Sequence, residues 1–441
     1  MKRWLALLLL LVGGMAARPA EAQQKEPLRT RAEALVDLFN GTIEPETLFS
    51  PAFLREVPAE QLKTIAGQVR EQLGAARSLA GIEARSAHAG SVSLEFERGT
   101  LQLELAVDPQ PPHLIQGLLI VGSQVKNDSF ARIVAELKAL PGPTSLAVAR
   151  LGAGAPEMIA AHESTRPMAV GSAFKLFLLA ELDRSVRAGQ RKWSDVVPLS
   201  HHSLPSGFLR EWPLSSPLTL HSLAALMISQ SDNSATDTLL HLLGRERVEA
   251  ILPVVGVKAP ERNRPFLSTM ETFALKGGDA ALAEAWVAGG EAERRALLGR
   301  LDEVKAEQID VARLNAQPNL IDSVEWFVSA EDLVRTFDWL RRHGTKETLD
   351  ILAINPGLPA PAAARFVYVG YKGGSESGVV AMGYVLKDQA GAWYAVTAAW
   401  NNPAARVEET QLALLLSRAI SLLLQPEPAL QNDGSAVSSA A

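Results

Sequence analysis

Two spacings of apolar residues follow one another in the first part of the chain. Apolar residues recur every three or four positions over 35–39 and 62–73, as they do on one face of an amphipathic helix. They then alternate with polar residues over 92–107, around a central Arg-Gly turn, which is typical of antiparallel strands. A further strand is expected over 114–121. The pattern predicts a small α+β domain over residues 28–122.

A polar junction at 122–128 separates this domain from the rest of the chain. Beyond it, strands are expected near the start and near the end of residues 128–425, with helices between them. The run from Met168 to Ala180 is almost continuously apolar, as in a helix that is buried on all sides. The other expected elements are a helix over 129–140, a strand from Leu146, strands over 366–372, 379–386 and 393–400, and a last helix over 407–424. The order predicts one antiparallel sheet with the helices packed on it, in a second domain over residues 128–425.

The N-terminus has the three parts of an export signal. Lys2 and Arg3 are positive, Trp4 to Val12 is apolar, and Ala20-Glu21-Ala22 offers a small-x-small cleavage site. The apolar run is shorter than the roughly 20 residues that span a bilayer. We predict a signal peptide over residues 1–22 and a periplasmic or secreted protein without a stable membrane anchor. An uncleaved anchor is the alternative.

Composition narrows the function further. The chain has 441 residues, which favours two folded domains, and its net charge of −6 offers no basic face for nucleic acid. It contains no cysteine, which excludes disulfides and thiol catalysis. We predict no cofactor and no metal site, because the pair His201-His202 has no carboxylate partner at ligand spacing. The Pro-, Ser- and Ala-rich residues 426–441 are expected to form a disordered tail.

The first candidate for chemistry is Ser172-Ala173-Phe174-Lys175, at the start of the expected buried helix. Side chains three apart lie on one helical face, so Lys175 reaches back over Ser172. A serine hydroxyl becomes a good nucleophile when a nearby base takes its proton. Apolar neighbours lower the pKa of a lysine, which allows Lys175 to be that base.

Two further motifs lie far along the chain. Ser231-Asp232-Asn233 stands between two expected helices, where its hydroxyl can relay a proton, although such a triplet alone is usually a helix cap. Tyr371-Lys372-Gly373-Gly374 ends an expected strand. Its cation and two glycines let a substrate backbone lie against the strand edge.

The three motifs together resemble the signature set of class A β-lactamases and penicillin-binding proteins. The resemblance covers about 300 residues and implies a five-stranded antiparallel sheet with a helical subdomain. It also implies that Ser172 is the acylated nucleophile, that Lys175 is a base in acylation, and that Ser231 passes a proton to the leaving group.

The same resemblance implies how a substrate is held. Asn233 would orient Lys175 and the substrate amide, and Lys372 would bind the substrate carboxylate and keep Lys175 neutral. Gly373, Gly374 and Ser375 would line the substrate, with the backbone N–H of Ser375 completing an oxyanion hole. The first domain resembles the cone-shaped fold of ketosteroid isomerases. Such a domain would serve either as a docking module or as a ligand-binding module. The two-domain layout resembles that of the β-lactamase-like protein of clavulanic-acid clusters.

Two positions depart from the family pattern. Gly373 stands where a hydroxyl residue is usual, so one hydrogen bond to a substrate carboxylate is lost unless Ser375 or Ser377 replaces it. Arg264, beside Pro265, stands where class A enzymes have the glutamate that activates the deacylating water, and arginine cannot be a general base. The remaining candidate for that role is Glu271.

The expected function is therefore acyl transfer through Ser172, with a small molecule as partner: a β-lactam, a carboxylic ester or a cell-wall D-Ala peptide. The missing glutamate argues against fast β-lactam hydrolysis. Two alternatives stay open. The chain is a covalent sensor that is acylated without turnover, or it is a non-catalytic relic that forms no adduct.

Overall fold

The computed structural model describes residues 26–425, so the predicted signal peptide and the predicted C-terminal tail lie outside the described residues. The chain divides into two compact units, Met1–Val121 and Gly122–Ala441. No helix of the described residues is long and apolar enough to cross a membrane.

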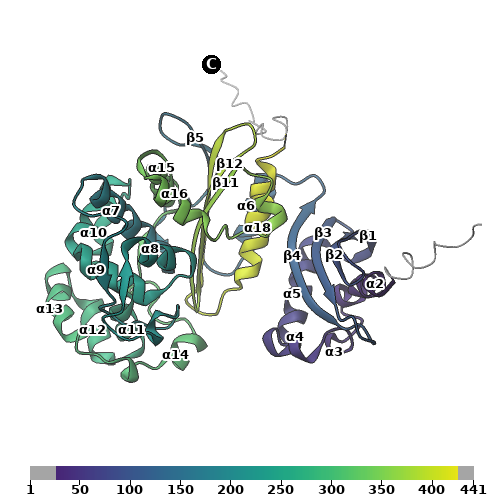
Figure 1. Cartoon of the computed structure of the whole chain (residues 1–441), viewed down its shortest axis with the longest axis horizontal. Coiled ribbons are helices and arrows are strands. Elements are labelled where there is room, and N and C mark those ends of the chain that lie inside the picture. The colour runs from purple at the N-terminus through teal and green to yellow at the C-terminus, as the bar shows by residue number, and fades with distance from the viewer. Residues whose placement is uncertain (1–25, 426–441) are drawn as a thin grey trace, which may run out of the picture. The chain divides into compact units, whose positions relative to one another are not determined.

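The first unit begins with helices and ends with a sheet (Figure 1). The four strands form an antiparallel meander in the order β1-β2-β3-β4. Inward residues such as Leu94 and Leu103 are fully buried, and β2 alternates strictly between more and less buried positions, as the sequence pattern predicts. The resemblance to a ketosteroid-isomerase cone stays a prediction. The bounds are α2 Glu26–Asn40, α3 Pro45–Leu48, α4 Pro51–Glu56, α5 Ala59–Leu73, β1 Ala76–Ala84, β2 Ala89–Phe96, β3 Gly99–Val107 and β4 Ile115–Val125.

The second unit is built on a five-stranded antiparallel sheet, which confirms the predicted α+β fold. Its strand order is β11-β12-β13-β5-β6, so the two strands from the start of the domain lie beside the three from its end. The bounds are β5 Thr144–Leu151, β6 Glu157–His162, β11 Tyr368–Glu376, β12 Val379–Lys387 and β13 Trp393–Asn401. Short two-residue or three-residue strands pair outside this sheet: β7 Met168–Ala169 with β10 Phe327–Val328, and β8 Val196–Pro198 with β9 Pro217–Thr219.

Helices cover both faces of this sheet (Figure 1). On one face Val148, Met382 and Val396 pack with α6 (Phe130–Ala139) and α18 (Glu409–Leu422). On the other face Ala149, Ala381 and Ala395 belong to the core of the helical subdomain. That subdomain comprises α7 Lys175–Arg187, α8 Leu220–Ser229, α9 Asn233–Leu243, α10 Arg245–Val254, α11 Thr269–Gly277, α12 Ala280–Ala288, α13 Glu291–Leu301, α14 Val311–Ala316, α15 Ala330–His343 and α16 Lys346–Ala353, with 3₁₀ turns η1 Gly171–Phe174, η2 Leu209–Glu211, η3 Pro260–Asn263 and η4 Ala306–Gln308. The short α17 Ala360–Ala363 packs instead with the core on the first face.

One buried ion cluster ties the first helix of this unit to its last. Arg418 of α18 is about 1% exposed and donates to both carboxylate oxygens of Asp128 and to those of Glu136 on α6. A buried guanidinium is tolerated only when its donors are matched in this way. The cluster fixes the two helices that close one face of the sheet.

Two sequence predictions need correction. The apolar run Met168 to Ala180 is not one helix: it comprises β7, the turn η1 and the start of α7. Hydrophobicity alone does not separate these elements, because all three are buried, and the break falls where Gly171 takes a φ of +49°. Lys372-Gly373-Gly374 was expected to end a strand, whereas it lies inside β11, which continues to Glu376.

Candidate active site

The candidate nucleophile lies on a tight turn between a short strand and a buried helix. Ser172 is in η1, and α7 begins at Lys175, three residues later. The helix is buried on nearly every side, and Lys175 itself is fully buried. The turn therefore exposes part of Ser172 and encloses the lysine that follows it.

The buried amine of Lys175 is held by the second motif. Its Nζ lies 2.7 Å from the Ser231 carbonyl oxygen, 3.1 Å from Ser231 Oγ and 2.6 Å from Asn233 Oδ1. Within residues 26–425 the Ser172 hydroxyl makes no hydrogen bond. In this arrangement the base is positioned by Ser231 and Asn233, and catalytic hydrogen bonds often tighten only when substrate binds.

Residues 231–233 also form a helix cap. Asp232 is the N-cap of α9, and its carboxylate accepts hydrogen bonds from the backbone N–H groups of Ala235 and Leu209. Ser231 has a φ of +55°, which turns the chain just before the helix. Asn233 donates through Nδ2 to the Leu204 carbonyl oxygen at 2.6 Å. The cap makes Asp232 structural and leaves Ser231 and Asn233 directed at Lys175.

Lys372 approaches the same hydroxyl from the sheet. It is 3% exposed on β11, and its Nζ lies 3.2 Å from Ser231 Oγ and also donates to the Gly373 carbonyl oxygen. Ser231 Oγ therefore lies between the amines of Lys175 and Lys372. Three remote stretches of the sequence meet at one hydroxyl, as the motifs predicted.

Burial sets the protonation of both amines. Burial lowers the pKa of Lys175 well below its usual value, and the charge of Lys372 lowers it further, against the opposing effect of Asp237 and Asp232. Burial lowers the pKa of Lys372 to about 7, with Glu409 acting in the opposite direction. The lowered pKa of Lys175 favours its neutral amine, which has a lone pair that can take a proton.

The edge of β11 lies directly against the nucleophile turn. A Cβ atom on Gly374 would overlap the backbone nitrogen of Ser172, and one on Gly171 would lie 3.1 Å from the backbone nitrogen of Ser375. Only a residue without a side chain permits this approach. It brings together the Ser172 and Ser375 backbone segments that the resemblance assigns to an oxyanion hole.

The loop ahead of α11 contains no free carboxylate at the expected position. Arg264 follows η3, and its Nε is buried without a partner. Glu271 is 2% exposed, caps α11 together with Ser268, and forms an ion pair of 2.6 Å with Arg245. Glu271 is therefore committed to the fold, which argues against the role of deacylating base that the sequence left open for it.

Sequence reasoning missed one carboxyl group beside the site. Asp237 lies one helical turn after Asn233 on α9, is 1% exposed, and accepts hydrogen bonds from the backbone N–H groups of Thr269 and Met270. Burial raises the pKa of its carboxyl group. The spacing of four from Asn233 was the available signal, because it puts both side chains on one face of α9.

A second missed group is the ion cluster at the end of β11. Lys276 of α11 lies 2.8 Å from Glu325 Oε1 and also bonds Glu376, the residue after Ser375. Burial raises the pKa of Glu376 to about 8, against the lowering effect of Lys276. The cluster joins the loop-side helix α11 to the strand that carries Lys372.

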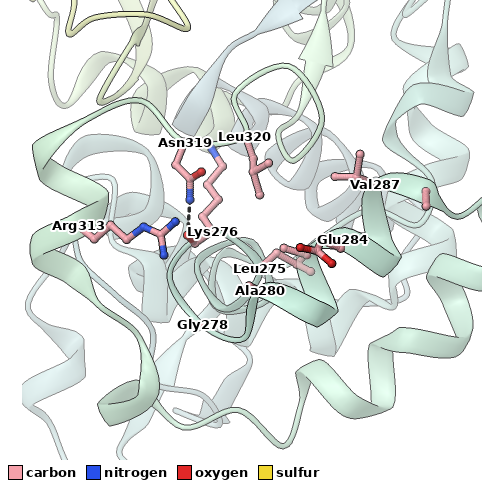
Figure 2. Close-up of a pocket in the computed structure, with 11 residues that line it drawn as sticks. Leu275, Lys276, Gly278, Ala280, Glu284, Val287, Arg313, Asn319 and Leu320 are labelled. Carbon is pink, nitrogen blue, oxygen red and sulfur yellow. Dashed lines mark hydrogen bonds between the residues drawn. The ribbon is translucent and has the colours of Figure 1, made fainter.

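The cavity drawn in Figure 2 is lined by none of the residues of the three motifs. It has a volume of about 390 Å³ and is lined by α11, α12, α14 and the loop at Asn319 and Leu320. Lys276 and Arg313 contribute to its wall, and Asn319 donates to the Lys276 carbonyl oxygen. Ser172, Lys175 and Lys372 do not line it.

The two histidines of the pair His201-His202 have different partners. His201 stacks on His241 with ring centroids 3.8 Å apart, and a ring nitrogen of His202 forms a hydrogen bond with the Trp212 carbonyl oxygen.

Solved structures similar to this chain include a β-lactamase from Sphaerobacter thermophilus DSM 20745, with 21% identity over 66% of this chain and 95% of that one and a TM-score of 0.46. A β-lactamase from Chitinophaga pinensis DSM 2588 has 17% identity over 67% and 96%, with a TM-score of 0.45. A structure of PBP-A has 15% identity over 66% and 93%, also with a TM-score of 0.45.

No match was found among curated proteins. The family model described as "Beta-lactamase enzyme family" matches residues 128–421. This range is well over half of the chain and contains Ser172, Ser231 and Lys372. The chain therefore belongs to the beta-lactamase enzyme family.

Proposed function

We propose that this protein is an exported active-site-serine hydrolase whose Ser172 is acylated by a β-lactam or a related acyl substrate. Membership of the family makes it a hydrolase-type enzyme. The observation that supports the finer assignment is the position of Ser231 Oγ, 3.1 Å from the amine of Lys175 and 3.2 Å from that of Lys372.

Acylation follows from this arrangement. Ser172 Oγ attacks the substrate carbonyl carbon while its proton passes to the neutral amine of Lys175. Ser231 gives its hydroxyl proton to the leaving nitrogen and is reprotonated by Lys175 through their hydrogen bond. The net result is one new Ser172–acyl ester bond, one broken carbonyl–nitrogen bond, and one proton moved from Ser172 to the leaving group.

The negative charge of the tetrahedral intermediate needs donors that are already in place. The close approach of Gly374 to the Ser172 turn supports a pair of backbone N–H donors from Ser172 and Ser375. Lys372, which is charged below about pH 7, supplies attraction for a substrate carboxylate.

Removal of the acyl group is the slow step of this proposal. A deacylating base contributes typically 10²–10⁴-fold. Arg264 cannot act as that base, Glu271 is bound to Arg245, and Asp237 already accepts two backbone hydrogen bonds. We therefore expect slow β-lactam turnover, with faster release where the acyl ester on Ser172 is more reactive. Esters and cell-wall D-Ala peptides are the alternative substrates.

The engagement of Glu271 and Asp237 in other contacts also favours a second function, a covalent sensor. A protein that is acylated readily and deacylates slowly holds its adduct, and a β-lactam or a cell-wall peptide would mark it. The enzyme and the sensor differ in the lifetime of the adduct. An enzyme releases the adduct many times during an assay, whereas a sensor keeps it.

One experiment separates these functions. The mature chain is incubated with a fluorescent penicillin and, in parallel, with a chromogenic ester, and its intact mass is followed beside Ser172→Ala. Turnover without a lasting adduct supports a hydrolase, and an adduct that outlasts the assay supports a sensor. Turnover that survives in Ser172→Ala, or neither adduct nor turnover, contradicts the proposal.

A further inference from the structure

The position of Gly373 is filled by a neighbouring side chain. A Cβ atom built on Gly373 would overlap the hydroxyl oxygen of Tyr371 and lie 2.9 Å from its ring carbon Cζ. Tyr371 and Gly373 are two residues apart on β11, so they face the same side of the strand. The phenol oxygen thus occupies the space that the side chain of a serine or threonine at 373 would take.

The Tyr371 ring is held there by its surroundings. Its centroid lies 4.8 Å from that of Tyr384, its β12 partner, whose hydroxyl donates to the Gly357 carbonyl oxygen at 3.0 Å. Gly357 has a φ of +60°, and a Cβ atom on it would overlap the Tyr371 ring. A glycine at each end of the ring therefore makes room for it.

The loop that covers the ring is connected to the catalytic segment. Asn355 accepts a hydrogen bond from the Gly357 backbone N–H at 3.0 Å and donates to the Ser229 carbonyl oxygen at 3.1 Å. Ser229 ends α8, two residues before Ser231. Tyr371 is therefore packed beneath a loop that is anchored next to the proton relay.

The hydroxyl itself is available to a ligand. In the described part of the chain no hydrogen bond engages it, and it is not among the polar atoms sealed from solvent. Burial of the ring raises the pKa of Tyr371, so the phenol stays protonated and remains a donor. By contrast, Ser377 Oγ is buried without a hydrogen-bond partner and is sealed from solvent.

We propose that Tyr371 is a substrate-binding residue, whose hydroxyl donates to the substrate carboxylate in place of the hydroxyl that Gly373 lacks. The inference rests on the proposed function. β11 is the edge strand of its sheet, so a carboxylate lying along that edge reaches Lys372 on one face and Tyr371 on the other. Tyr371 thereby selects substrates that bear a carboxylate beside the scissile bond.

The test compares benzylpenicillin with its methyl ester. The second-order rate of Ser172 acylation is measured for both by intact mass, and the acid-to-ester ratio is the readout. Tyr371→Phe is expected to lower that ratio about tenfold or more, the value of a hydrogen bond to a charged group, with little change for the ester. Tyr368→Phe is the matched control, because it removes a phenol of the same strand that donates to the Leu349 carbonyl oxygen.

A double variant with a hydroxyl at position 373 distinguishes the loss of a hydrogen bond from a structural disturbance. Gly373→Thr alone is expected to lower acylation because its Cβ overlaps the Tyr371 oxygen. Combined with Tyr371→Ala, which opens that space, Gly373→Thr should recover the preference for the acid over Tyr371→Ala alone. A ratio in Tyr371→Phe equal to that of the native chain overturns this inference alone. A native chain that neither substrate acylates overturns the proposed function and this inference with it.

Discussion

The Nζ atom of Lys175 lies 2.6 Å from Asn233 Oδ1, although the two residues are 58 positions apart in the sequence. The contact holds a buried amine at the start of α7 against the cap of α9. An amide oxygen orients the amine without adding a charge, so the amine can remain neutral. Exchanging this amide for a carboxylate would add a negative charge beside the amine and remove the donor to the Leu204 carbonyl oxygen.

Asn233→Asp is therefore expected to slow acylation at neutral pH. A carboxylate beside Lys175 favours its ammonium form and raises its pKa. Acylation, which needs the neutral amine, should fall tenfold or more at pH 7 and recover at higher pH. The measurement is the pH profile of Ser172 acylation, in which the rising limb moves to higher pH. If the acylation rate falls at every pH and the rising limb of the profile does not shift, Asn233 acts in substrate binding alone.

The charge of Lys372 predicts a second pH effect. Burial lowers its pKa to about 7, so its ammonium group is charged below that pH and neutral above it. Attraction for a substrate carboxylate is then lost as the pH rises through 7, whereas an ester substrate has no carboxylate for Lys372 to attract. The acid-to-ester ratio of acylation rates should fall above pH 7. Parallel profiles for the two substrates would contradict this assignment.

Arg264→Glu should speed release of the acyl group. A carboxylate at this position supplies the base that the loop lacks, and such a base typically contributes 10²–10⁴-fold. We expect a shorter adduct lifetime by at least tenfold, with an unchanged rate of adduct formation. The readout is the decay of the penicilloyl mass after excess penicillin is removed. Arg264→Gln is the control, since it removes the guanidinium without adding a base.

Gly374→Ala should abolish acylation while the protein stays folded. The added methyl group would overlap the Ser172 backbone nitrogen, so η1 and β11 must separate and the donors of the oxyanion move apart. Loss of one such donor typically costs 10²–10³-fold. Gly152→Ala is the matched control, because a Cβ atom there meets nothing within 4 Å. Acylation at the native rate in Gly374→Ala would rule out this oxyanion hole.

Arg418→Met should destabilise the second unit without touching the site. Removing the buried guanidinium leaves Asp128 without this partner, while Glu136 keeps its ion pair with Arg132, and we expect a cost of about 3 kcal/mol. Arg132→Met removes the half-exposed partner of the same Glu136, and such a pair contributes less than about 1 kcal/mol. The free energies of unfolding in urea give the comparison. Equal decreases in the free energy of unfolding in the two variants would contradict the role given to Arg418.

Much of the fold follows from spacing alone. The alternation of Leu94, Phe96 and Leu101 gives the meander of the first unit, and the apolar late strands give β11 to β13 because hydrophobic faces must be buried. The three motifs point to Ser172, Ser231 and Lys372 only in combination, since a triplet such as Ser231-Asp232-Asn233 alone is usually a helix cap.

What the sequence could not predict depends on register and on partners. The phenol of Tyr371 lies over Gly373 only because both residues share one face of β11 and Gly357 leaves room for the ring. The ion pair between Lys276 and Glu376 joins groups 100 positions apart. Both arrangements depend on a remote element, the loop at Gly357 in one and α11 in the other, and such contacts are set by packing rather than by a local pattern.

Peptide mapping of the acylated protein tests most directly whether Ser172 is the nucleophile. The native chain is labelled with penicillin, digested, and the peptide that carries the added mass is identified, beside Ser172→Ala treated in the same way. We predict that the added mass lies on Ser172 in the native chain and that the variant carries none. An adduct on another residue, or one of equal yield in Ser172→Ala, would contradict it.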